Sequence, residues 1–358
     1  LLILFFIGIK DDILNISARK KLIAEIFAIA IVAILGNIRI SSFHGFLGIE
    51  ELPYFISILF TIFVFVVVIN GFNLIDGIDG LAAGVGILTA TSLGIWFLLV
   101  GNNPYAAFCF SVVGALLAFF VFNVFGKKNK IFLGDTGSLI VGLMVSVFTI
   151  KFLEITISGT VVPTDFPAPA ITIAILIVPL IDTLRVFTLR ILVGKSPFKP
   201  DRFHLHHKLL LLGFSHLKVT LIILGFNLVI ILLSFLLRGL GNIRMLLILF
   251  PAAVLITSIP GFFFRYRVRD VITRVEPLGK SSWILPITFA NLLDAYITRF
   301  RNWRSGSSAP AEEKKNEREH DLDRILQNAY LEFKNGNDQS NEFSDQDECP
   351  GNIKKAGS

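Results

Sequence analysis

The sequence predicts an all-α, polytopic membrane protein with a polar tail, and two observations lead to this fold class. Of the 358 residues, 54% are hydrophobic and only 17% are charged, whereas soluble chains average about 45–50% apolar and about 25% charged residues. Apolar runs close to the roughly 20 residues that cross a bilayer also follow one another along most of the chain. Charge gathers instead after residue 265. We therefore expect a membrane body followed by a water-soluble tail.

The membrane body contains eight candidate spans, each bounded by Gly, Pro, Asn or charged residues. The apolar run LLILFFIGI at the start is too short to cross a bilayer, so we interpret it as the end of a span whose beginning is missing. Cys109 lies in an apolar run and Cys349 in the tail, so no disulfide framework is expected. The spans are expected at about 21–36, 54–72, 81–101, 104–125, 138–152, 168–190, 218–237 and 244–264.

Composition divides the chain into three parts. Residues 1–264 form the membrane domain. Residues 265–304 mix Arg with aromatic and aliphatic residues, which is typical of an amphipathic segment at the membrane interface. Residues 305–358 form a polar tail, in which an apolar spacing predicts one short helix before a disordered end.

The distribution of Lys and Arg orients the spans. If the chain alternates sides, most basic residues fall in the loops near 10–20, 126–137 and 191–217 and in the segment after 265. The positive-inside rule makes that side cytoplasmic. Every polar motif of interest also lies there, an arrangement that favours a single site at one membrane face over a conduction path.

Four polar clusters occupy the predicted cytoplasmic side. They belong to the motifs KDD, NGFNLIDGIDG, FLGDTGS and DRFHLHH. Their polar members are Asp11 and Asp12; Asn70, Asn73, Asp76 and Asp79; Asp135; and Asp201, Arg202, His204, His206 and His207.

Asp76 and Asp79 follow an apolar run with no charged residue. If the helix continues through them, their spacing of three places both on one face. Two neighbouring carboxylates stay ionised only beside a cation or solvent, and oxygen ligands favour Mg²⁺ or Mn²⁺ over zinc. The structural alternative is a hydrated helix end in which Gly77 and Gly80 form a turn.

The two other acidic clusters each permit a structural interpretation. Asp11 and Asp12 are candidates for a site or a solvated cap of the next helix. Asp135 lies between Gly134 and Gly137, where the backbone can approach a ligand closely, but a capping role is equally compatible with the pattern.

The histidine cluster is predicted to be cationic. His204, His206 and His207, with Arg202 and Lys208, form a basic group suited to a pyrophosphate. A zinc site and histidines that merely lie at the membrane interface are the alternatives. Arg185, three residues after Asp182 in an apolar run, belongs either to a buried ion pair or to an anion contact. Carboxylates for a hard metal and bases for phosphate on one face suit phosphoryl transfer.

Three of these motifs and a fourth stretch, PLIDTLRV, also carry a family resemblance. NGFNLIDGIDGLAAG, IFLGDTGSLIVG, PLIDTLRV and DRFHLHHKLLLLGFSH, in this order within residues 1–237, resemble the polyprenyl-phosphate N-acetylhexosamine-1-phosphate transferases. The HLHH form is similar to the WecA/TagO-like members and departs from the MraY-like pattern. The tail is not covered by the resemblance. Because such members have about eleven spans, the resemblance also implies that this sequence lacks about two and a half of them.

The resemblance implies an enzyme of the bacterial inner membrane, with its active site and C-terminus cytoplasmic. Its donor is a UDP-sugar, most simply UDP-GlcNAc, its acceptor is undecaprenyl phosphate, and UMP leaves. The transfer requires Mg²⁺, with Mn²⁺ as a possible substitute, and starts synthesis of a cell-envelope polysaccharide. The open alternatives are an MraY-like phospho-MurNAc-pentapeptide transferase and, outside enzymes, a membrane transporter. A homodimer is a further expectation, and no nucleic-acid partner is expected.

The resemblance also assigns roles to residues. Asp11 and Asp12 are implied to lie near the lipid phosphate, where one accepts its proton. Asp76 and Asp79 are implied beside the nucleotide and metal, and Asp135 as a direct Mg²⁺ ligand. The substrate contacts are implied to come from His204, His206 and His207 on the diphosphate, from Asn73 and Asn123, and, with the basic cluster, from Arg185 and Arg202.

Overall fold

The computed structural model describes residues 1–14, 16–157, 166–192 and 204–275. These residues are helical apart from their connections and one isolated bridge between Ser42 and Glu51, which confirms the all-α prediction. The expected tail helix and most of the expected interfacial segment fall within 276–358, outside the described residues. Asp201 and Arg202 also lie outside the described residues, within 193–203.

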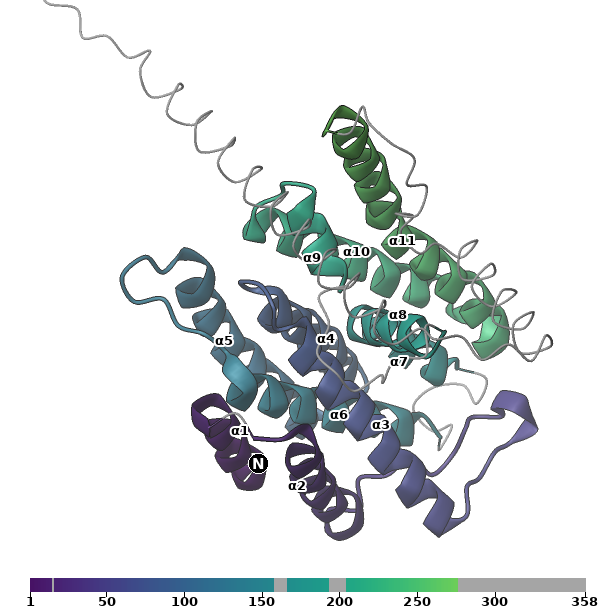
Figure 1. The fold of residues 1–358 in the computed structure, drawn as a ribbon. Coiled ribbons are helices and arrows are strands. Elements are labelled where there is room, and N and C mark those ends of the chain that lie inside the picture. Colours follow the sequence, from purple (N-terminus) through teal and green to yellow (C-terminus); the bar gives the residue numbers. More distant parts are fainter. Residues whose placement is uncertain (15, 158–165, 193–203, 276–358) are drawn as a thin grey trace, which may run out of the picture. The chain divides into compact units, whose positions relative to one another are not determined.

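Eleven α-helices are assigned in the described part of the chain (Figure 1). The N-terminal half contains α1 (Leu2–Leu14), α2 (Ala18–Ala30), α3 (Tyr54–Ile75), α4 (Leu81–Leu99), α5 (Asn103–Phe125) and α6 (Gly134–Ile157). The C-terminal half contains α7 (Ala168–Ile175), α8 (Ile177–Leu192), α9 (Leu205–Leu211), α10 (His216–Leu236) and α11 (Gly241–Val275).

Six helical segments of the described chain are long and apolar enough to cross a membrane: α3, α4, α5, α6, α10 and residues 238–260. The pair α7 and α8 adds a seventh if it counts as one span bent by 77°. Pro179 explains the break, because it has no N–H to donate to the carbonyl of Ile175. The region 21–36, expected as a span, is instead a 13-residue α2 followed by a five-residue π-helix (Ile31–Leu35). The protein is thus a multi-pass membrane protein.

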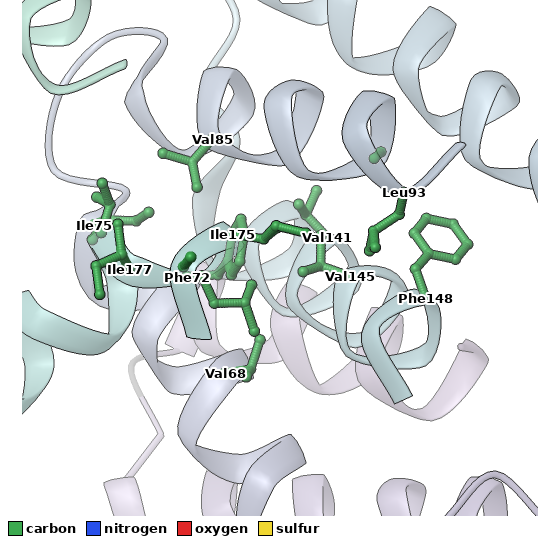
Figure 2. Close-up of a cluster of buried hydrophobic side chains, with 14 of the residues drawn as sticks. Val68, Phe72, Ile75, Val85, Leu93, Val141, Val145, Phe148, Ile175 and Ile177 are labelled. Atoms are coloured by element: carbon green, nitrogen blue, oxygen red, sulfur yellow. The ribbon is translucent and has the colours of Figure 1, made fainter. Parts of the chain in front are cut away.

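The membrane body is held together by apolar packing between α3, α4, α6, α7 and α8. Figure 2 shows this core, in which Phe72 on α3 and Phe148 on α6 are fully buried. Helix α5 contributes less, since only 17% of its span is buried. Its remaining apolar surface is suited to lipid, where exposed Leu and Phe side chains cost nothing.

The helix ends form two polar regions at opposite ends of the bundle. At the C-terminal end of α6, the Glu154 carboxylate accepts hydrogen bonds from the backbone N–H and hydroxyl of Ser41, at 2.8 and 2.9 Å. At the N-terminal end of α6 lie the ends of α1 and α3 and the start of α2. This second region contains the acidic residues that the sequence singled out.

Candidate functional site

The N-terminus of α6 is built around the carboxylate of Asp12. Its Oδ1 accepts the backbone N–H of Asp135 at 2.8 Å, and its Oδ2 accepts the Thr136 hydroxyl at 2.7 Å. Gly134 has a φ of +64°, which disfavours residues with a Cβ, and a Cβ here would lie 3.0 Å from the Asp12 carboxylate oxygens. Asp12 therefore caps α6 from another helix and fixes where Asp135 begins it.

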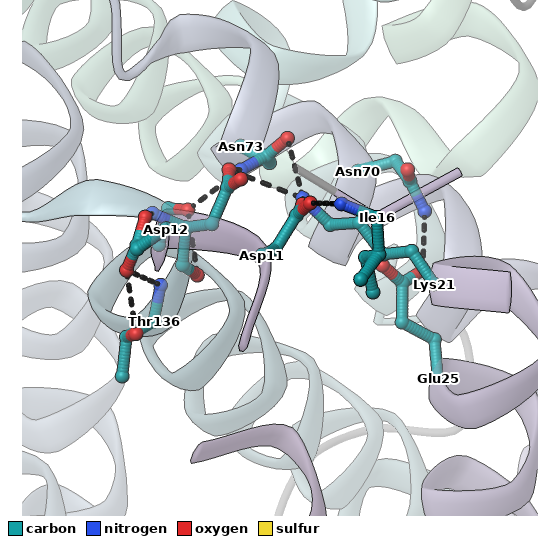
Figure 3. A network of polar contacts seen from close by, with 10 residues as sticks. Asp11, Asp12, Ile16, Lys21, Glu25, Asn70, Asn73 and Thr136 are labelled. Atoms are coloured by element: carbon teal, nitrogen blue, oxygen red, sulfur yellow. Dashed lines mark hydrogen bonds and ion pairs between the residues drawn. The ribbon is translucent and has the colours of Figure 1, made fainter. Parts of the chain in front are cut away.

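Asp11, one residue earlier, lies with Asp135 beside the same ammonium group. Lys21 Nζ is 2.9 Å from Asp11 Oδ2 and 3.1 Å from Asp135 Oδ1 (Figure 3). Asn73 at the end of α3 donates from Nδ2 to Asp135 Oδ1 and, at 2.9 Å, to the Ser138 hydroxyl. The sequence analysis missed Lys21, because it is one of several basic residues in SARKK and only the fold distinguishes it.

Asp76 lies at the edge of the acidic group formed by Asp11, Asp12 and Asp135. The structure ends α3 at Ile75 and turns the chain there, so Asp76 and Asp79 do not share a helix face as the continued helix would have placed them. Burial, together with the smaller effect of the charges of Asp135 and Asp12, raises the pKa of Asp76 to about 7, while the backbone N–H of Gly134 opposes the shift. Among the described residues, no cationic side chain offsets this rise in the pKa of Asp76.

Asp79 contacts different residues from those around Asp76. Its Oδ2 lies 2.7 Å from Lys130 Nζ and 3.2 Å from His216 Nδ1. Asn123, buried on α5, organises the same turn, because its Oδ1 accepts the backbone N–H of Gly80 at 2.6 Å and its Nδ2 donates to the Ile131 carbonyl at 2.7 Å. Asn123 is therefore bonded to backbone atoms at both ends of its amide.

The histidine cluster packs against the same turn. A Cβ on Gly77 would lie 2.3 Å from Nε2 of His206, so only glycine allows this approach. His206 is 1% exposed, and neither ring nitrogen has a hydrogen-bond partner among the described residues. Burial, and secondarily the neighbouring His207, lowers the pKa of His206 to about 3. The ring is neutral at pH 7, so the prediction of a uniformly cationic histidine patch is wrong for His206.

His204 and Arg185 also have defined partners. His204 Nδ1 lies 2.8 Å from Asp182 Oδ2, and the rings of His204 and His206 are stacked with their centroids 5.8 Å apart. Arg185 Nη1 donates to the Thr257 carbonyl at 3.3 Å. Among the described residues, Arg185 therefore forms no direct ion pair with Asp182, and its contact with an anion stays a prediction.

The turn from Asp76 to Gly80 joins these groups into one site. It has Asp76 beside the acidic group, Gly77 against His206, and Asp79 beside Lys130 and His216. The residues brought together come from α1, α2, α3, α6 and the α9–α10 region, distant in sequence. The structure thus gathers the acidic and histidine clusters around a single turn.

The donor set suits a hard divalent cation. Asp11, Asp12, Asp76 and Asp135 offer carboxylate oxygens, against one ammonium group from Lys21. No three metal-ligating side chains in the described ranges converge into a ready-made metal site. Mg²⁺ typically binds one or two carboxylates and completes its shell with water and substrate phosphates, so a preformed three-ligand site is not required for it.

A known protein family matches the part of the chain that contains the acidic group. Residues 1–153 match the family model described as "Glycosyl transferase family 4". This stretch is similar to glycosyl transferase family 4. It includes α1 to α5 and most of α6, and therefore Asp11, Asp12, the Asp76–Gly80 turn and Asp135. The histidine cluster lies after the family 4 match.

Curated relatives extend the similarity beyond residue 153. The chain is 30% identical over 226 residues to the undecaprenyl-phosphate alpha-N-acetylglucosaminyl 1-phosphate transferase of Escherichia coli O157:H7, covering 62% of this chain and 59% of the relative. It is 32% identical over 237 residues to the decaprenyl-phosphate N-acetylglucosaminephosphotransferase of Mycolicibacterium smegmatis, covering 61% and 56%. The chain thus spans less than two thirds of the length of these relatives.

Proposed function

We propose that the protein transfers a sugar 1-phosphate, GlcNAc 1-phosphate in the simplest case, from a UDP-sugar to undecaprenyl phosphate. The observation that supports this most directly is the gathering of four carboxylates, one lysine and the histidine segment around the Asp76–Gly80 turn. The names of the relatives supply the acceptor and the sugar. No observation favours a muramyl-peptide donor, and the collection of ionisable groups at one end of the bundle disfavours a transporter.

The reaction is a displacement at phosphorus. An oxygen of the lipid phosphate attacks the phosphorus that is linked to the sugar, and the bond from that phosphorus to the UMP oxygen breaks. A lipid diphosphate sugar forms and UMP leaves. Catalysis of such a step consists mainly of positioning and neutralisation of charge, so it needs few covalent contributions from the protein.

We infer roles from the contacts of each residue. Asp135 and Asp76 are the residues that would hold Mg²⁺, which supplies charge neutralisation to the diphosphate when bound. Asp12 fixes the start of α6 and so the position of Asp135. Asp11 lies beside Lys21, and we infer that this acid and this ammonium group lie near the incoming lipid phosphate.

The remaining polar residues are proposed to bind the donor. His204, His206 and His207 lie on the other side of the turn and are suited to the diphosphate, with the neutral His206 acting as a hydrogen-bonding group and not as a charge. Asp79 and Asn123 organise the turn on the side of α5, where we place the nucleotide. Asn73 orients Asp135.

The site is proposed to face the cytoplasm of a bacterial cell, at its inner membrane. Support comes from the basic residues in the loops at this end, such as Lys127 and Lys128, in accordance with the positive-inside rule. A UDP-sugar is too polar to cross the bilayer, so the proposed site must face the compartment that supplies the donor, which we take to be the cytoplasm.

The test uses membranes that carry the full-length protein, with radiolabelled UDP-GlcNAc and undecaprenyl phosphate. We expect Mg²⁺-dependent release of UMP and a labelled lipid product. Asp135→Asn should abolish both while leaving expression unchanged. Glu154→Gln, the same chemical change at the opposite end of α6, should retain them. Wild-type turnover in Asp135→Asn would remove its assignment as a metal ligand, and no product from the unmodified protein would refute the function.

A further inference from the structure

Asp182 is a buried carboxylate with two strong donors outside its own helix. It lies on α8, is 4% exposed, and follows the bend between α7 and α8. Its Oδ2 lies 2.8 Å from His204 Nδ1, and its Oδ1 accepts the backbone N–H of Leu205 at 2.8 Å. A carboxylate in or near hydrocarbon is costly unless it is paired, so these two contacts account for its presence.

The two contacts fix both the position and the tautomer of His204. Leu205 is the first residue of α9, so the bond to its N–H holds the start of that helix against α8. An ionised carboxylate only accepts hydrogen bonds, so the proton of a neutral His204 must sit on Nδ1. The Nε2 atom is then left as the nitrogen available to another group.

His204 is linked to the Asp76–Gly80 turn through its contact with His206. His204 stacks on His206 with an interplanar angle of 7°, and His206 lies so close to Gly77 that a Cβ there would overlap the imidazole ring. A shift of the start of α9 would therefore move both rings relative to Asp76. No other acidic side chain pairs with His204 among the described residues.

We propose that Asp182 is a positioning residue of the site, which sets the ring orientation and the Nδ1–H tautomer of His204 and anchors the histidine segment against the Asp76–Gly80 turn. Its consequence for catalysis rests on the proposed transferase function. Asp182 itself does not touch the reacting groups. It acts through His204, whose Nε2 it presents as a hydrogen-bond acceptor in the neutral ring.

The substitution Asp182→Asn tests the tautomer directly. The backbone N–H of Leu205 can only donate a hydrogen bond. The side-chain amide of the Asp182→Asn variant must therefore turn its oxygen towards Leu205 and its NH₂ towards His204 Nδ1. The ring is then expected to switch to the Nε2–H tautomer. The switch is read from the ¹⁵N chemical shifts of histidine-labelled full-length protein in lipid nanodiscs, with the signals of His204 assigned by their loss in His204→Gln.

The control is Glu154→Gln, a carboxylate-to-amide change at the far end of α6, which should leave the His204 signals unchanged. An Nε2–H tautomer of His204 in the unmodified protein would overturn the proposal, as would retention of the Nδ1–H tautomer in Asp182→Asn. Because the first measurement needs only His204→Gln for its assignment, it decides the matter even if Asp182→Asn does not fold.

Activity separates positioning from simple packing. Asp182→Asn should lower the transfer rate about 10–100-fold, the usual loss when the partner of a functional histidine is removed. In the His204→Gln background the same substitution should cause no further loss, since both act through one ring. A further loss of similar size would assign Asp182 to packing. If the unmodified protein transfers no sugar phosphate, the proposed function fails, while the tautomer result stands or falls independently.

Discussion

Replacement of Lys21 by methionine tests the electrostatic account of the acidic group. The ammonium lies 2.9 and 3.1 Å from Asp11 and Asp135, and the side chains of Lys21 and Asp11 are 13% and 11% exposed. Removing one partner of a buried ion pair costs about 3–5 kcal/mol, and of an exposed pair about 0–1 kcal/mol. Because Asp135 is 32% exposed, we expect a value between these limits, about 2–4 kcal/mol.

The assay is thermal unfolding in detergent, with and without Mg²⁺. Lys21→Met should lower the melting temperature, by roughly 2–4 °C for each kcal/mol lost, and Mg²⁺ should restore more stability to the variant than to the unmodified protein. Mg²⁺ binds more tightly where an ammonium no longer competes for the carboxylates, and ligand binding stabilises by mass action. Lys20→Met is the matched control, since Lys20 is exposed. Equal effects of the two substitutions would refute the reasoning.

Three further predictions concern the same region. Gly77→Ala should destabilise the protein by about 1–3 kcal/mol through overpacking against His206 and should reduce transfer, whereas Gly114→Ala, whose Cβ meets open space, should not lower the melting temperature. Asp12→Ala should cost about 1–2 kcal/mol by removing the cap of α6, and a melting temperature unchanged from the unmodified protein would contradict that role. Because the pKa of Asp76 is raised from 3.8 to about 7, the folded state binds this proton more tightly than the unfolded state does. Without Mg²⁺, the stability of the protein should therefore fall as the pH rises from 4 to 7. Mg²⁺ affinity, measured by calorimetry, should rise over the upper part of that range. Asp76→Asn should remove the contribution to both trends, and a variant with the slopes of the unmodified protein would show that another group causes them.

The sequence predicted which residues would meet but not how they pair. Asp11, Asp12, Asp76 and Asp135 do gather at one end of the bundle, as motifs at alternate helix ends implied. Asp79 instead pairs with Lys130 and His216, because α3 ends at Ile75 and the DGIDG segment turns. The turn is held in part by Asn123, 43 residues away, which accepts the backbone N–H of Gly80, and no local pattern contains that information.

The partners of Lys21 and Asp182 were likewise not predicted from the sequence. Lys21 lies within a basic run and Asp182 within an apolar helix, and for each the partner that defines its role lies outside its own helix. The expected charge of His206 failed for a related reason, since its neutrality follows from burial by surrounding elements and not from its neighbours in HLHH.

The sequence alone determined the helical membrane fold, the end of the bundle at which the polar residues collect, and the chemical types present there. These properties follow from local quantities, namely the length of apolar runs, the placement of basic loops and the identity of side chains. The tertiary structure decided the pairing of Lys21 with Asp11 and Asp135, of Asp79 with Lys130, and of Asp182 with His204. Ion pairs and hydrogen bonds act over about 3 Å, so which groups form them depends on how distant helices pack.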